Sequence, residues 1–153
     1  MLGLGVDFGG VIVKLADRKR GTDTALNGIE GTEIAHDGVF DTMAKLVSHF
    51  EGRVWIVSKA GLAMQAKTIS WLDAVDFYSR TGLNKSHVRF CLERQDKANI
   101  CSELKITHFI DDRVHIMQIL RYIVPNLYLY CESTESRFCP PWATTVFWHL
   151  RVH

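Results

Sequence analysis

The sequence predicts an α/β fold, a three-layer Rossmann-like domain with a central five-stranded parallel sheet. Short β-prone runs alternate with stretches of helical periodicity, and this alternation is typical of parallel strands joined by right-handed crossovers. The first run, Leu2–Phe8, is nearly continuous in apolar residues and glycine, as expected for a strand buried on both faces. The chain has 153 residues, of which 47% are hydrophobic and 23% charged, which suits one globular domain.

Five strands are expected, each a short run of β-branched, aromatic and other apolar residues. They lie at Leu2–Phe8, Arg53–Val57, Val88–Leu92, His108–Ile110 and Leu127–Cys131. No repeat, low-complexity tract or Pro/Gly/Ser-rich linker divides the chain. Residues 1–153 are therefore expected to form a single domain without a sizeable cap insertion.

Helices are expected between these strands and in the tail. Apolar residues at helical spacing predict the first, between Gly38 and Glu51, and Gly52 can end it. Asp96 is a candidate N-cap for the helix after the third strand. The other helices are expected at Gly61–Leu72, Arg113–Tyr122 and Trp142–Leu150.

The bulk composition limits the partners and the compartment. A formal charge of +1 gives no reason to expect a nucleic acid or an anionic membrane. No apolar run approaches the roughly 20 residues of a membrane helix, and no secretory signal is visible. The four cysteines could make two disulfides, but a core of this size needs none, and the absence of a CxxC pair argues against a zinc site. Reduced thiols are therefore expected. We expect a cytoplasmic protein, and a homo-oligomer if the aromatic tail is exposed.

Polar side chains follow three of the predicted strands where those strands end. Asp7 ends the first strand, Ser58 ends the second, and Asp111 and Asp112 end the fourth. Lys97 stands at the start of the helix that follows the third strand. In an open parallel sheet, ligands bind outside the carboxyl ends of the strands, where the strand order reverses. These residues are therefore expected to meet in one site.

In order and spacing, these motifs resemble the haloacid dehalogenase-like (HAD) superfamily, mostly phosphotransferases that attack phosphorus with an aspartate. Asp7, in DFGGV, stands where the family carries its nucleophile. Ser58, in VWIVS, and Lys97 stand where the family contacts the phosphoryl group, and Lys59 is a further candidate contact. The resemblance implies a magnesium-dependent phosphohydrolase that works through an aspartyl-phosphate on Asp7.

The resemblance also implies a set of metal ligands. Asp111 and Asp112, in THFIDDR, match the acidic pair that holds magnesium in the family. Asp7 and the backbone carbonyl of Gly9 would complete the set. Hard oxygen ligands suit Mg²⁺. A cation between the nucleophile and a phosphoryl oxygen offsets the repulsion between two negatively charged groups.

Gly9 departs from the family pattern. Most phosphatases of the family carry at this position a second aspartate that protonates the leaving group. Such help is worth roughly 10²–10⁴ in rate. Three alternatives stay open: an acid from the following loop, a leaving group that needs no proton, or an impaired protein that binds a phosphorylated ligand or a protein partner. The candidate replacement acids are Asp17, Asp23, Glu30, Glu33, His36 and Asp37.

The length of the loop bears on the substrate. Dehalogenases and phosphonatases of the family also lack the second aspartate, but they carry a helical cap. The segment between Gly10 and Arg53 has about 42 residues, and one helix takes roughly a third of them. The remainder is too short for a helical cap. An open site would suit a phosphorylated small molecule or macromolecule, or a lid supplied by a partner subunit.

Overall fold

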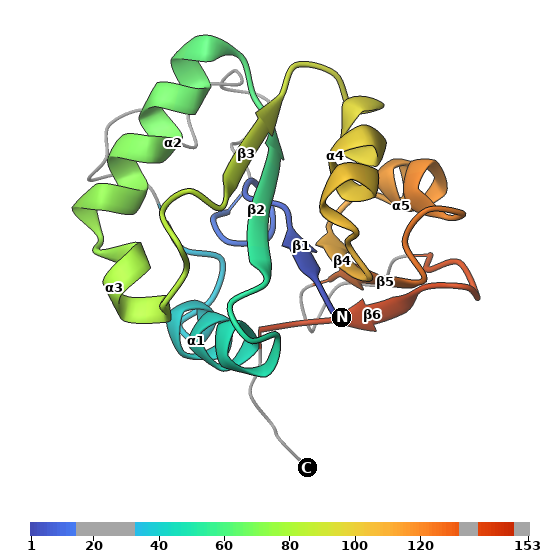
Figure 1. Cartoon of the computed structure of the whole chain (residues 1–153), viewed down its shortest axis with the longest axis horizontal. Coiled ribbons are helices and arrows are strands. Elements are labelled where there is room, and N and C mark those ends of the chain that lie inside the picture. The colour runs from blue at the N-terminus through green and yellow to red at the C-terminus, as the bar shows by residue number, and fades with distance from the viewer. Residues whose placement is uncertain (15–32, 132–137, 149–153) are drawn as a thin grey trace.

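The sheet has six parallel strands in the order β3-β2-β1-β4-β5-β6 (Figure 1). The computed structural model describes residues 1–14, 33–131 and 138–148. The strands are β1 (Leu4–Val6), β2 (Val54–Lys59), β3 (Val88–Cys91), β4 (His108–Asp111), β5 (Asn126–Tyr130) and β6 (Thr144–Val146). The chain moves outward from β1 to β3, returns to the other side of β1 at β4, and continues to β6. The strand order therefore reverses between β1 and β4.

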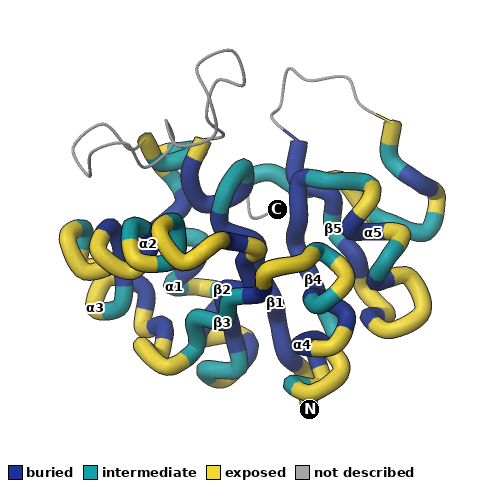
Figure 2. Tube along the Cα trace, turned by 90° about the horizontal axis from the view of Figure 1, so that it is seen from above, coloured by how far each residue is buried: buried dark blue, intermediate teal, exposed yellow. Residues whose placement is uncertain are grey.

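Helices cover both faces of this sheet (Figure 1). The helices are α1 (Val39–His49), α2 (Leu62–Ala74), α3 (Phe77–Thr81), α4 (Asp96–Leu104) and α5 (Val114–Leu120). Buried side chains of α1, α2 and α3 form one apolar core with β1, and those of α4 and α5 form a second core on the opposite face. Because both faces are covered, β1 is buried along its whole length (Figure 2). The three-layer α/β architecture is confirmed.

A glycine lets β1 pack closely against β4. Gly5 is paired with Phe109 across these two strands. A Cβ atom built on Gly5 would lie only 2.4 Å from the Phe109 ring. The ring therefore occupies the space that any larger side chain at this position would need.

The tail differs from the expectation. Residues 144–146 form β6, parallel to β5, and not part of a helix over Trp142–Leu150, of which residues 149 and 150 lie outside the described ranges. Two β-branched threonines and a valine suit a strand, and the free edge of β5 gives them backbone partners. The sheet consequently has six strands and not five. Trp148, beyond β6, is buried and donates its indole N–H to the carbonyl of Val11.

Two smaller expectations also need correction. Asp96 is the first residue of α4, and its side chain makes no capping hydrogen bond there. The short helix α3, in the connection after α2, was not expected. Cys91, Cys101 and Cys139 are free thiols, as expected. Among the described residues, no helix combines the length and the apolar character needed to cross a membrane.

Candidate active site

Two neighbouring strand ends bring the predicted nucleophile and the acidic pair together. Val6 of β1 is paired with Ile110 of β4, and the N–H of Asp7 donates to the Ile110 carbonyl at 2.9 Å. Asp7 and Asp111 therefore leave adjacent strands at the same level. This is the point where the strand order reverses, which is the usual ligand site of an open α/β sheet.

Lys97 reaches the same point from α4. Its ammonium Nζ lies 3.0 Å from Asp7 Oδ1 and 2.9 Å from Asp111 Oδ2, and its side chain is 3% exposed. Burial by itself would lower the pKa of Lys97, but the two carboxylates outweigh burial and raise it. Lys97 is therefore a permanent positive charge between two carboxylates.

The single positive charge of Lys97 does not fully neutralise the three carboxylates. Burial, followed by the charge of Asp111, raises the pKa of Asp7 from 3.8 to about 6, against the opposing effect of Lys97. Burial is also the main cause that raises the pKa values of Asp111 and Asp112. Three buried acids with raised pKa values mark a place where negative charge is not fully compensated.

The donor set fits a hard divalent cation. Carboxylate oxygens of Asp7, Asp111 and Asp112 lie within 4.8 Å of one another. Asp112 Oδ1 is buried and has no hydrogen-bond partner in the described part of the chain. The other two acids already accept hydrogen bonds, from Lys97 and from the N–H of Arg113. A cation such as Mg²⁺ would satisfy the orphaned oxygen and supply the missing positive charge.

The predicted phosphoryl contacts lie at the same edge of the sheet. Ser58 is buried near the end of β2, two residues beyond Ile56, which is paired with Val6. Lys59 follows it with an exposed side chain. Neither side chain forms a hydrogen bond or ion pair with the carboxylate cluster among the described residues. Their role in holding a phosphoryl group therefore stays a prediction.

Gly9 lies in a tight loop directly after Asp7. The N–H groups of Ile12 and Val13 both donate to the carbonyl of Phe8, which turns the chain back on itself. The φ angle of Gly9 is outside the left-handed region, and a Cβ built there meets no atom of the described residues within 4 Å. Among the described residues, neither backbone conformation nor space therefore requires glycine at this position.

The candidate replacement acids that the structure describes do not bond to the cluster. Asp17, Asp23 and Glu30 lie outside the described residues. Of the described candidates, Glu33 forms an ion pair with Lys14 at 2.9 Å, and His36 Nδ1 accepts the N–H of Gly38. Neither of these two, nor Asp37, forms a hydrogen bond or ion pair with the carboxylate cluster within the described ranges.

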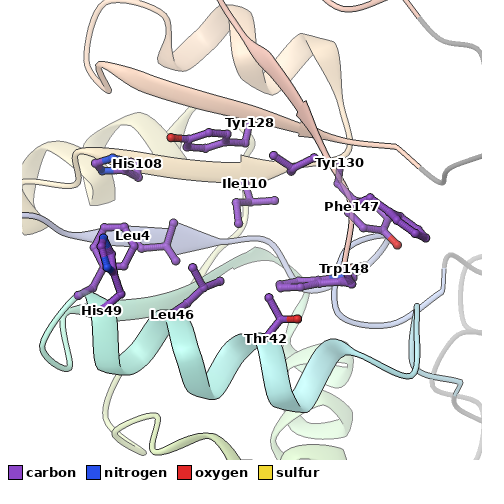
Figure 3. A pocket seen from close by; sticks show the side chains of 12 residues that line it. Leu4, Thr42, Leu46, His49, His108, Ile110, Tyr128, Tyr130, Phe147 and Trp148 are labelled. Atoms are coloured by element: carbon purple, nitrogen blue, oxygen red, sulfur yellow. The ribbon is translucent and has the colours of Figure 1, made fainter. Parts of the chain in front are cut away.

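A cavity separate from this site lies between α1 and the strands β4 and β5. Its volume is about 340 Å³. Figure 3 shows His49 and His108 at one end of it and Trp148 at the other. None of the predicted site residues lines it. Sequence reasoning missed this cavity because its walls come from α1, three strands and the tail, which no local pattern connects.

The comparisons with known proteins identify the fold. No protein-family model and no curated protein matches the sequence. The structure is similar to the crystal structure of a haloacid dehalogenase-like family hydrolase from Xanthomonas campestris, with a TM-score of 0.63 and 11% sequence identity. The match covers 95% of this chain and 90% of that chain. The expected HAD-like fold is thereby confirmed.

Proposed function

We propose that the protein is a magnesium-dependent phosphohydrolase that acts through an aspartyl-phosphate on Asp7. One observation carries the proposal: Asp7, Asp111 and Asp112 cluster at the strand reversal of a HAD-like sheet, and the buried Lys97 bridges Asp7 and Asp111. Buried carboxylates of this kind are costly, and a structural domain has no need of three of them. Their retention favours a role in binding and reacting with an anion.

The chemistry divides between Asp7 and the groups around it. A carboxylate oxygen of Asp7 forms a bond to phosphorus while the bond from phosphorus to the leaving-group oxygen breaks. That oxygen departs with the electron pair. Water then attacks the same phosphorus, the bond to Asp7 breaks, and inorganic phosphate leaves. The proton of the water passes to solvent, and the Asp7 carboxylate is restored.

The surrounding residues would hold the transferred group. Lys97 places a fixed positive charge beside the attacking oxygen. The hydroxyl of Ser58, the amides after it and Lys59 would contact the phosphoryl oxygens. When bound by Asp7, Asp111, Asp112 and the Gly9 carbonyl, Mg²⁺ supplies the charge that offsets repulsion between the carboxylate and the phosphoryl group. Without that charge, the approach of two anions would be strongly opposed.

Gly9 sets the preferred leaving group in this proposal. No side-chain carboxyl at position 9 can give the departing oxygen a proton. An aryl or acyl phosphate needs none, because its leaving group is already stable as an anion. An alkyl phosphate does need one. We therefore infer a substrate with a good leaving group, and an uncapped site that admits a phosphorylated small molecule or part of a macromolecule.

Gly9 also favours the second candidate function, which is binding of a phosphorylated ligand without turnover. The test compares the wild-type protein with Asp7→Asn, which keeps the shape of the side chain but removes the nucleophile. Both are incubated with Mg²⁺ and 4-nitrophenyl phosphate, and then with a panel of alkyl phosphates.

The proposal expects turnover of the aryl ester that is lost in Asp7→Asn and in the presence of a chelator. Beryllofluoride or phosphate should raise the melting temperature in Mg²⁺ but not after the change Asp112→Asn, because the cation holds the anion. Stabilisation by these anions without turnover of any ester would overturn the hydrolase and leave the binding function.

A further inference from the structure

Arginines in this protein are usually engaged by a neighbour. Six of the ten arginines of the chain lie in the described ranges. Four of these make hydrogen bonds to carbonyl groups, an ion pair or close contacts with aromatic rings. They are Arg53, Arg80, Arg89 and Arg121. The other two, Arg94 and Arg113, make no such contact through their guanidinium groups with any described residue.

Both exceptions lie close along the chain to residues of the candidate site. The carbonyl of Arg94 accepts the N–H of Lys97 at 3.1 Å, so Arg94 stands one turn before the buried lysine. Arg113 directly follows Asp112, and its own N–H donates to Asp111 Oδ1 at 3.1 Å. The two arginines thus leave the backbone on the two chain segments that carry Lys97 and the acidic pair.

Their exposure leaves them accessible to a ligand. Both side chains are half-buried, whereas Lys97 is buried. The backbone N–H of Arg113 lies at the acidic pair, and its guanidinium charge opposes the rise that burial causes in the pKa of Asp112. It nevertheless forms no ion pair with that carboxylate among the described residues. A guanidinium is always charged and offers a planar fork of donors that matches a carboxylate or a phosphate.

We propose that Arg94 and Arg113 bind a second anionic group of the substrate, a carboxylate or a further phosphate, next to the phosphoryl group that Asp7 attacks. This inference rests on the proposed function and narrows its substrate class. Lys97 and Ser58 already provide for the transferred phosphoryl group. The two arginines therefore add positive charge beyond what that group needs.

The test uses aryl phosphates that differ in one substituent. They are phenyl phosphate, 3-carboxyphenyl phosphate, 3-carbamoylphenyl phosphate and 1,3-phenylene bisphosphate. The carbamoyl ester keeps the size of the carboxylate and removes its charge, and the bisphosphate distinguishes a phosphate from a carboxylate as the second group. The variants are Arg94→Gln, Arg113→Gln and the double variant. Lys45→Gln serves as control, because Lys45 is an exposed cation on α1 that forms no ion pair with any residue of the described ranges.

The wild-type protein is expected to prefer the carboxylate or the bisphosphate ester over the carbamoyl ester by about tenfold in kcat/KM, the effect of a charged hydrogen bond. The preference should fall to within about twofold in the double variant and persist in Lys45→Gln. Arg94→Lys should retain part of it. An equal preference in wild type and double variant would overturn the inference.

A binding measurement distinguishes failure of this inference from failure of the proposed function. If no ester is turned over, the proposed hydrolase fails, and the arginines are judged by calorimetry with benzylphosphonate and 3-carboxybenzylphosphonate in Mg²⁺. A tighter Kd for the carboxylate, lost in the double variant, supports the second anion site. Equal Kd values for the two phosphonates overturn it.

Discussion

The change Gly9→Asp tests whether leaving-group protonation is the only function that the site lacks. The described residues leave room for the new side chain, because a Cβ at this position meets none of their atoms within 4 Å and the backbone φ is ordinary. The variant should therefore fold. A general acid contributes roughly 10²–10⁴ in rate, or about 3–5 kcal/mol of barrier. That gain is expected for alkyl phosphates and should stay below about tenfold for aryl phosphates, which need no proton.

The assay measures kcat/KM for both classes of ester with wild type, Gly9→Asp and Gly9→Asn. The asparagine variant fills the same space without an ionisable proton, so it controls for size and polarity. Adding Asp7→Asn to Gly9→Asp should abolish all turnover. If the aryl ester is turned over but Gly9→Asp gives no gain with alkyl phosphates, the reasoning is refuted, and the substrate geometry limits the reaction instead.

Three further predictions concern stability. Lys97→Met should lower the free energy of unfolding by about 3–5 kcal/mol, because two buried carboxylates lose their partner. The measurement is urea denaturation at pH 7 in the presence of a chelator, and the control variant Lys45→Met should leave the free energy of unfolding unchanged. The pKa of Asp7 is about 6 in the folded protein and 3.8 in the unfolded chain. The protonated side chain therefore stabilises the fold fully below pH 3.8, and this stabilisation, at most about 3 kcal/mol, is lost as the pH rises through 6. The difference between wild type and Asp7→Asn, followed by urea unfolding in chelator, should shift over that window, and parallel curves would contradict the shift. Gly5→Ala should lower the melting temperature and cost roughly 1–3 kcal/mol, because its Cβ would lie 2.4 Å from a phenylalanine ring; Gly61→Ser, with open space, should not.

Local patterns were sufficient for most of the fold. Each of the first five strands is a short apolar run, and the structure shifts its ends by at most two residues. The helix after β1 was found because Val39, Met43 and Val47 repeat at helical spacing and are indeed buried. The tail was misassigned because its apolar residues suit a helix or a strand equally. Only the free edge of β5 decided that residues 144–146 pair as β6.

In the candidate site, too, the sequence predicted some features and tertiary packing decided the others. Asp7, Lys97, Asp111 and Asp112 were predicted to meet, because parallel strands end at one edge and the order reverses between β1 and β4. The sequence could not predict that Lys97 is buried between two carboxylates, because that contact depends on how α4 packs. The sequence places Arg94 and Arg113 at the border of the predicted site, but for the same reason it could not show that their guanidinium groups bond to none of the described residues.

The sequence by itself determined which residue types stand at the strand ends, because these are fixed by local order: an aspartate that is the predicted nucleophile, an acidic pair, a lysine, and a glycine two residues after the aspartate. The tertiary structure decided the electrostatics. Burial depends on distant segments closing around a site, and it is burial that raises the pKa of Asp7 to about 6 and leaves Asp112 Oδ1 without a partner. The open space over Gly9 is likewise a property of the packed chain.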